Sequence, residues 1–172
     1  MTEPNATLQT MWQRQSIRKY RDEPVPADHL GLILEAARRA PTGSNRQNWR
    51  LIVVTAPDLR QQVAAACMGQ TWIGEAGAIL VLVKLPDQGD TNGAIVLDHA
   101  ILAATSLGYG TCWVGAIDRE QVGALLGLPD GYTVQNLTPV GIADDTPPRR
   151  PRKAPEELFM AEGWGRPLSY EL

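Results

Sequence analysis

The sequence predicts an α+β fold in which helices cover both faces of a central sheet. Short runs of aliphatic and β-branched residues alternate along the chain with longer segments whose apolar residues recur at helical spacing. This alternation is typical of a layered sheet with helices packed on it. At 172 residues and 44% hydrophobic residues, the chain is long enough for one well-packed core. Because no shift in composition divides it, we expect one domain over residues 1–172, with residues 1–9 flexible and a basic loop and tail over residues 144–172.

The clearest predicted helix spans residues 26–40. Its apolar residues recur at three- and four-residue intervals, Pro26 suits a first helical turn, and Pro41 prevents the helix from continuing. The run at residues 51–54 reads Leu-Ile-Val-Val and contains no polar position, as expected of a strand buried on both faces. These two elements form the first helix–strand unit.

The rest of the chain continues the alternation. Asp118 can cap a short helix that ends at Gly127, because Gln121 occupies the capping-box position and the last turn is apolar. The other predicted helices span residues 57–68 and 93–107, a last helical turn spans 156–162, and the other strands span 78–85, 111–117 and 132–142. Between the last strand and the last turn lies a loop rich in Pro and Arg.

Charge and cysteine content exclude several classes of function. A net charge of -3 leaves no basic face for nucleic acid, so a cluster of arginines is better explained by one small anionic ligand. Cys67 and Cys112 lack the spacing of metal ligands or of a disulfide framework, so we expect two reduced core residues and no metal site. No apolar run reaches the about 20 residues of a membrane span, and residues 1–10 carry no targeting signal. We therefore expect a cytoplasmic protein.

Two polar segments are candidates for a binding site. Residues 14–18 read Arg-Gln-Ser-Ile-Arg, which gives enough donors to hold a phosphate and leaves one cation for a second anionic centre. Residues 41–49 form a polar loop able to contact a planar, polar ligand. A dinucleotide site is excluded, because the glycines of residues 107–115 precede a predicted strand and lack the G-x-G-x-x-G spacing, and no P-loop lysine is present. The arginines must bind their anion in another way.

These segments resemble the nitroreductase family, flavoproteins that bind FMN. Residues 14–18 match its R-R-S-x-R, which the family carries on a first helix, and residues 23–26 match its E-P-V-P. Residues 40–49 are similar to A-P-S-x-x-N-x-Q-P-W, residues 107–115 to L-G-L-G-T-C-W-I-G, and residues 150–157 to a basic-x-Arg segment before P-x-E-E. The blocks occur in the order of the family.

The resemblance implies a three-layer α/β/α sandwich with a mixed central sheet, and a homodimer with FMN at its interface. Hydride would pass from NAD(P)H through flavin N5 to a small acceptor such as a nitroaromatic or a quinone, and no side chain need act as an acid or base. His29 and His99 match no catalytic motif. The residues that the resemblance implies at the FMN site are Arg14, Gln15, Ser16, Arg18, Pro41, Thr42, Gly43, Asn45, Gln47, Gln70, Cys112, Trp113, Val114, Gly115, Arg150 and Arg152.

The basic residues would neutralise two anionic parts of the flavin. The resemblance places Arg14 and Ser16 at the phosphate and ribityl chain, where Arg150 and Arg152 would complete the phosphate contacts. It places Arg18 near the N1/C2 carbonyl edge, where two-electron reduction leaves negative charge. Taken alone, the first cluster would be an exposed helix face and the second a solvated loop. Which residues of the second cluster hold the phosphate stays open among Arg149, Arg150, Arg152 and Lys153.

The remaining implied residues would contact the flavin ring. Asn45 and Gln47 would reach the flavin of the partner subunit, and a simple turn would not require both. Gln70 would meet the pyrimidine edge, the alternative being an exposed residue at a helix end. A backbone N–H of Val114 or Gly115 would point at N5, the alternative being a buried strand that ends in a glycine.

Three features depart from the family pattern. Asn48 stands where the family usually has proline, Val114 stands where many larger members have glutamate, and only residues 86–92 separate the second strand from the next helix. We therefore expect a less rigid loop and an open active site. Because similar proteins also destroy flavin or remove halogens reductively, another flavin chemistry remains an alternative. An FMN-binding module without turnover and a ligand-free structural dimer are the others.

Overall fold

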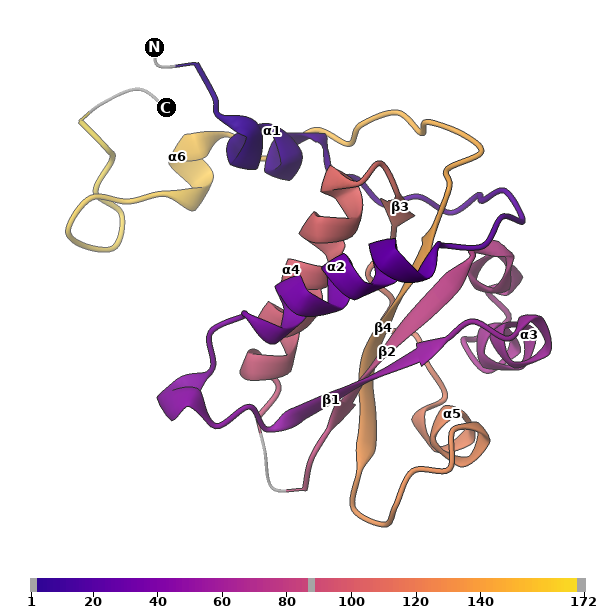
Figure 1. The fold of residues 1–172 in the computed structure, drawn as a ribbon. Helices are drawn as coiled ribbons and strands as arrows, with labels where there is room; N and C mark the ends of the chain where they lie inside the picture. The colour runs from indigo at the N-terminus through magenta and orange to yellow at the C-terminus, as the bar shows by residue number, and fades with distance from the viewer. Residues whose placement is uncertain (1–2, 87–88, 170–172) are drawn as a thin grey trace.

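The computed structural model describes residues 3–86 and 89–169, which form a four-stranded sheet with helices on both faces (Figure 1). The strands are β1 (Trp49–Val54), β2 (Ala78–Lys84), β3 (Gly110–Thr111) and β4 (Thr133–Gly141), in the spatial order β1-β2-β4-β3. The helices are α1 (Ala6–Gln13), α2 (Ala27–Arg38), α3 (Pro57–Ala65), α4 (Thr91–Ser106), α5 (Arg119–Leu125) and α6 (Pro155–Leu158), with short 3-10 helices η1 (Gly43–Asn45) and η2 (Thr71–Glu75). The predicted alternation of helices and strands is confirmed.

Alternate residues of β2 face the two helical layers. Leu80 and Leu82 belong to a core cluster shared with α2 and α4, whereas Ile79 and Val81 belong to a second cluster shared with α3 and α5. β2 is therefore buried on both faces, as its unbroken apolar run predicts. β1 lies at the edge of the sheet. Its two faces also pack on these clusters, Leu51 and Val53 on the first and Ile52 and Val54 on the second, but of its residues only Val54 is fully buried.

Every pair of neighbouring strands in the described sheet is antiparallel. β2 and β4 pair from Ala78 opposite Val140, with a register shift between Leu82 and Val83. The parallel pairing expected of a mixed sheet is confined to an isolated bridge between Ser16 and Thr111. The chain after α1 therefore adds to the β3 edge without becoming a full strand.

The helix signals were reliable. α2 lies within residues 26–40, and Pro26 is its N-cap residue. Asp118 caps α5 as predicted, because its Oδ1 accepts a hydrogen bond of 3.0 Å from the backbone N–H of Gln121.

Within residues 3–86 and 89–169, no helix has both the length and the apolar character that crossing a membrane requires.

The strand predicted over residues 111–117 is much shorter. Only Gly110–Thr111 pair as β3, and Val114 makes an isolated bridge to Leu137. The ladder stops because the N–H of Cys112 donates to the hydroxyl Oγ1 of Thr138, at 3.3 Å, instead of to a backbone carbonyl. The chain therefore leaves the sheet as a loop beside β4.

The two ends of the chain also differ from expectation. The helix at Ala6–Gln13 ends before Arg14, so the first arginine block follows the helix and is not carried on it. Its N-cap is Asn5, whose Oδ1 accepts from the N–H of Leu8 at 3.1 Å. The predicted final turn is reduced to α6, and the segment after α6 extends away from the sheet near α1 (Figure 1).

Candidate functional site

The first arginine block lies along the β3 edge of the sheet. The N–H of Ile17 donates to the carbonyl of Thr111 at 2.9 Å, and the Ile17 side chain is buried. A Cβ on Gly110 would lie only 2.9 Å from Cβ of Ile17, so this position needs a glycine for the segment to approach. Because neighbouring side chains of an extended segment alternate, Ser16 and Arg18 lie on the opposite side from Ile17.

Cys112 lies where the first arginine block, residues 14–18, comes near the segment of residues 107–115. Burial raises the pKa of the Cys112 thiol, while the Arg18 guanidinium, a hydrogen bond with Ser16 and the Arg14 guanidinium lower it, in that order. The net effect is a raised pKa, which favours the protonated thiol over the thiolate. Ser16 also forms a parallel bridge with Thr111, the neighbour of Cys112, although the two segments lie almost 100 positions apart in sequence.

Two polar atoms in this region lack partners. Oε1 of Gln15 and Oγ1 of Thr111 are buried without a hydrogen bond to any described residue. An unpaired buried polar group costs about 1–3 kcal/mol, so native structures seldom tolerate it without a ligand or water. The orphaned atoms indicate a polar group that this region can bind.

The start of η2 also contributes residues to this region. Nε2 of Gln70 donates to the carbonyl of Cys67 at 2.9 Å and to that of Ala116 at 3.3 Å. The Gln70 amide therefore tethers this turn to the loop after Cys112, and both of its donor hydrogens are used. Trp72 lies two residues further, and its ring centre is 6.0 Å from Cζ of Arg18, within cation–π range.

The loop after Cys112 corrects one expectation. The N–H of Val114 donates to the carbonyl of Leu137 at 2.9 Å, so it is not available to a ligand. The carbonyl of Val114 accepts from Leu137 and from the Asn136 amide. Gly115 is exposed and is the remaining candidate for a backbone donor, next to the exposed side chain of Trp113.

The basic loop near the C-terminus approaches the first arginine block through Arg149. Its guanidinium donates to the carbonyl of Trp12 and, at 3.1 Å, to that of Gln13, which are among the last carbonyls of α1. Lys153 pairs with Glu157 at 3.5 Å. Arg150 and Arg152 are exposed, and neither forms an ion pair within the described chain.

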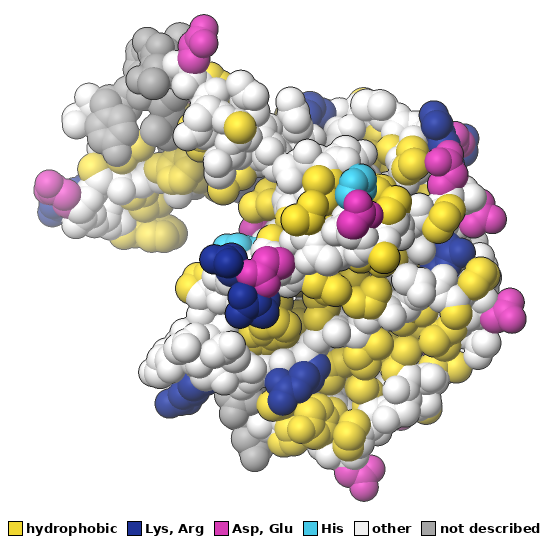
Figure 2. All heavy atoms as spheres, viewed as in Figure 1, with side chains coloured by type: hydrophobic (Ala, Val, Ile, Leu, Met, Phe, Trp, Pro, Cys, Tyr) yellow, Lys and Arg dark blue, Asp and Glu magenta, His cyan; other side chains and the backbone are white. Residues whose placement is uncertain are grey.

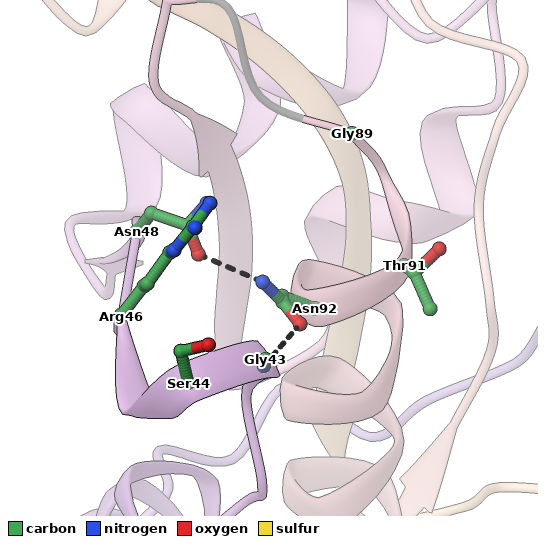
Figure 3. A pocket seen from close by; sticks show the side chains of 7 residues that line it. All are labelled: Gly43, Ser44, Arg46, Asn48, Gly89, Thr91 and Asn92. Atoms are coloured by element: carbon green, nitrogen blue, oxygen red, sulfur yellow. Dashed lines mark hydrogen bonds between the residues drawn. The ribbon is translucent and has the colours of Figure 1, made fainter.

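The polar loop is not brought to the arginines within one subunit. It lies between α2 and β1, at the opposite end of α2 from the segment that follows α1 (Figure 1). Pro41, Gly43, Asn45 and Gln47 are exposed there, and Thr42 is partly buried. Together with the start of α4, the loop lines a pocket of about 370 Å³ (Figure 3).

The backbone of this loop is unusual. Ser44, Asn45 and Gln47 have φ values of 51°, 55° and 49°, a region that non-glycine residues seldom adopt. The N–H of Gln47 donates to Oγ1 of Thr42, and its Nε2 donates to both oxygens of Asn45 at 3.1 Å. Concentrated strain of this kind occurs at ligand-binding segments.

Comparisons with known proteins show which family this chain resembles in sequence. The sequence profile of the nitroreductase family matches residues 11–100 and 86–142. The chain is 31% identical to the NADH dehydrogenase of Thermus thermophilus, over 75% of this chain and 82% of that protein. It is 30% identical to the FMN reductase [NAD(P)H] of Bacillus subtilis, over 92% and 74% of the two chains.

The folds also agree. The crystal structure of nitroreductase A from Vibrio parahaemolyticus superposes with a TM-score of 0.88 and 26% identity, covering 94% of this chain and 77% of that one. The structure of NfrA2 from B. megaterium gives the same TM-score of 0.88, with coverage of 94% and 76%. The profile match covers most of the chain, and the chain belongs to the nitroreductase family.

Proposed function

We propose that this protein is an FMN-dependent oxidoreductase that takes hydride from NAD(P)H and passes it to a small acceptor, such as a nitroaromatic or a quinone. The observation that carries the proposal is the pairing of the first arginine block with Thr111, through the N–H of Ile17 and the Ser16 bridge, next to two unpartnered buried oxygens. The relatives named FMN reductase and nitroreductase support the same assignment.

The residues present fit a phosphorylated flavin. Arg14 offers a charge-assisted donor for the phosphate, and Ser16 offers a hydroxyl for the phosphate or the ribityl chain. The orphaned oxygens of Gln15 and Thr111 can accept hydrogen bonds from ribityl hydroxyls. Arg150 and Arg152, which lack ion-pair partners in the described structure, remain for the phosphate once Arg149 and Lys153 are engaged elsewhere.

The flavin ring would lie between the loop after Cys112 and the turn at Gln70. Because both hydrogens of the Gln70 amide bind backbone carbonyls, its Oε1 is the atom left to accept the N3–H of a flavin. Gly115, and not Val114, would supply the backbone N–H at N5. The Arg18 guanidinium would stabilise negative charge at the N1/C2 edge.

When bound, FMN supplies the atom that accepts hydride and then donates it. The chain supplies orientation and charge.

The separation of the polar loop from the arginines favours a homodimer with two shared sites. Asn45 and Gln47 would then serve the flavin bound mainly by the partner subunit. Large apolar side chains are exposed on α1 and on the C-terminal segment, where Trp12 is 59% and Trp164 is 92% exposed. Figure 2 shows hydrophobic side chains along that segment. An obligate homodimer would bury about 2,000–5,000 Å² in its interface.

The test of the activity is an anaerobic mixing experiment. We expect the purified protein with FMN bound to lose the visible absorption band of oxidised flavin when NADH or NADPH is added, and to regain it when a nitroaromatic or a quinone follows. The protein without added nucleotide is the control. A band that persists with both nucleotides would refute the oxidoreductase and favour a module that binds FMN without turnover.

A further prediction concerns Arg149, which we place outside the phosphate site. Because it binds the end of α1 immediately before Arg14, Arg149→Ala should weaken FMN binding by about three- to tenfold through the position of Arg14. In an Arg14→Ala background the same change should have no further effect, which a titration of FMN measures. Lys153→Ala, a change of equal charge in the same loop, should leave FMN affinity unaltered. An additive loss in the double variant would place Arg149 on the phosphate itself.

A further inference from the structure

The left-handed residues of the polar loop must be held from outside the loop as well as from within. Ser44, Asn45 and Gln47 each adopt a positive φ that is unfavourable for a side-chain-bearing residue. The hydrogen bonds of Gln47 to Thr42 and Asn45 are local and exposed to solvent. Bonds of this kind hold a turn weakly, because water competes for both partners.

One side chain from α4 bonds both ends of the turn. Oδ1 of Asn92 accepts from the N–H of Gly43 at 3.1 Å, and its Nδ2 donates to Oδ1 of Asn48 at 2.9 Å. Figure 3 shows the single amide of Asn92 reaching across the mouth of the turn to both residues. The amide thus fixes the separation between the residues that flank Ser44 to Gln47.

The start of α4 is itself firmly placed. The carbonyl of Asp90 accepts from the Gln135 amide at 2.8 Å, and its carboxylate pairs with Lys84 at 3.1 Å. Gly93 is so tightly packed that a Cβ there would lie 2.5 Å from the Gln135 side chain and 2.9 Å from Leu82. Asn92 therefore connects the loop to β2 and β4, the rigid centre of the sheet.

The residue that Asn92 binds at the end of the turn is Asn48. It stands where the family pattern has proline, a residue that fixes its own φ. We infer that Asn92 is a positioning residue for the cofactor site: with Asn48 it holds the polar loop in the conformation that presents Asn45 to the FMN of the partner subunit. The pair supplies by side-chain hydrogen bonds the rigidity that proline supplies elsewhere in the family. This inference rests on the proposed function.

The test compares FMN affinities of the dimeric protein and its variants by titration. Asn92→Ala removes both bonds and should raise the dissociation constant of FMN about tenfold, and Asn48→Ala, which removes the bond from Nδ2 of Asn92, should raise it at least about threefold. The double variant should lose less affinity than the two single effects combined, because the two residues share one bond. Asn48→Asp keeps an acceptor for Nδ2 of Asn92 and should retain the affinity of the unmodified protein.

Matched controls separate this role from general stability and from the proposed function. Thr91→Ala changes the neighbouring residue in the same pocket and should leave FMN binding unchanged. Unfolding temperatures without FMN should be similar for all variants, since the loop is exposed. In an Asn45→Ala background, Asn92→Ala should have little further effect. If Asn45→Ala weakens FMN but Asn92→Ala and Asn48→Ala do not, the positioning role is refuted; if Asn45→Ala has no effect, the shared cofactor site fails first.

Discussion

Replacing Arg14 by alanine will weaken FMN binding by about 10- to 100-fold, because a charge-assisted contact to phosphate is worth about 1.5–3 kcal/mol and each 1.4 kcal/mol changes affinity tenfold. Riboflavin, which lacks the phosphate, should bind weakly to the unmodified protein and lose little in the variant. FAD should also bind weakly, because the chain has no dinucleotide motif for its adenylate. Titration with the three flavins, followed by the quenching of flavin fluorescence, measures all of these affinities.

The matched control is Arg21→Ala, which removes the same charge a few residues further along the chain. Arg21 is exposed and lies near Glu23 and Asp144, so its loss should alter FMN affinity little. Salt should weaken FMN binding more in the unmodified protein than in Arg14→Ala. An unchanged FMN affinity in Arg14→Ala, or an equal loss for riboflavin, would refute the phosphate assignment.

Elements with local signals were predictable from the sequence. The limits of α2 follow from two prolines, and the cap of α5 follows from Asp118, whose side chain binds the backbone three residues later. β2 is buried on both faces because every residue of its run up to Val83 is apolar. Each of these signals involves residues close in sequence, so pattern alone is sufficient.

Structural features that depend on residues far away in the sequence could not be predicted from local patterns. The strand predicted over residues 111–117 ends early because the Thr138 hydroxyl takes the N–H of Cys112, and nothing near Cys112 indicates Thr138. β1 has the same composition as a central strand but lies at an edge, which only the order of the sheet decides. α1 has one local signal, Asn5 as an N-cap, but no strong apolar periodicity.

In the candidate site, too, some residues could be predicted from sequence motifs and others could not. Family motifs identify Arg14, Ser16, Arg18 and Cys112, and the structure brings their two segments side by side. Sequence reasoning missed the roles of Thr111 and Asn92, which depend on an orphaned hydroxyl and on a turn far along the chain. It left open whether Arg149 holds the phosphate, and the contacts of Arg149 with the end of α1 could not be foreseen from the sequence. Trp72 carried a weak signal, an aromatic residue two positions after the predicted amide Gln70.

A mixed dimer will show whether the site is shared. Subunits with Arg14→Ala and subunits with Asn45→Ala each damage one half of a composite site. In a heterodimer of the two, one site carries both defects and the other carries neither, so FMN binding should recover to about half that of the unmodified dimer. Differently tagged subunits, purified as heterodimers and titrated with FMN, give this number, and both mutant homodimers serve as low-affinity references.

The reciprocal pairing is the control that makes the result decisive. When one subunit carries both Arg14→Ala and Asn45→Ala and its partner is unmodified, each composite site contains one defect, so no site should bind FMN with full affinity. If each subunit instead builds its own site, this dimer would keep one intact site and the first heterodimer would keep none. The two pairings contain the same substitutions in equal number, so a difference in expression or in global stability cannot imitate the pattern. Full-affinity binding in the reciprocal dimer, with none in the first, would place Arg14 and Asn45 in one subunit's site and remove the functional need for the dimer.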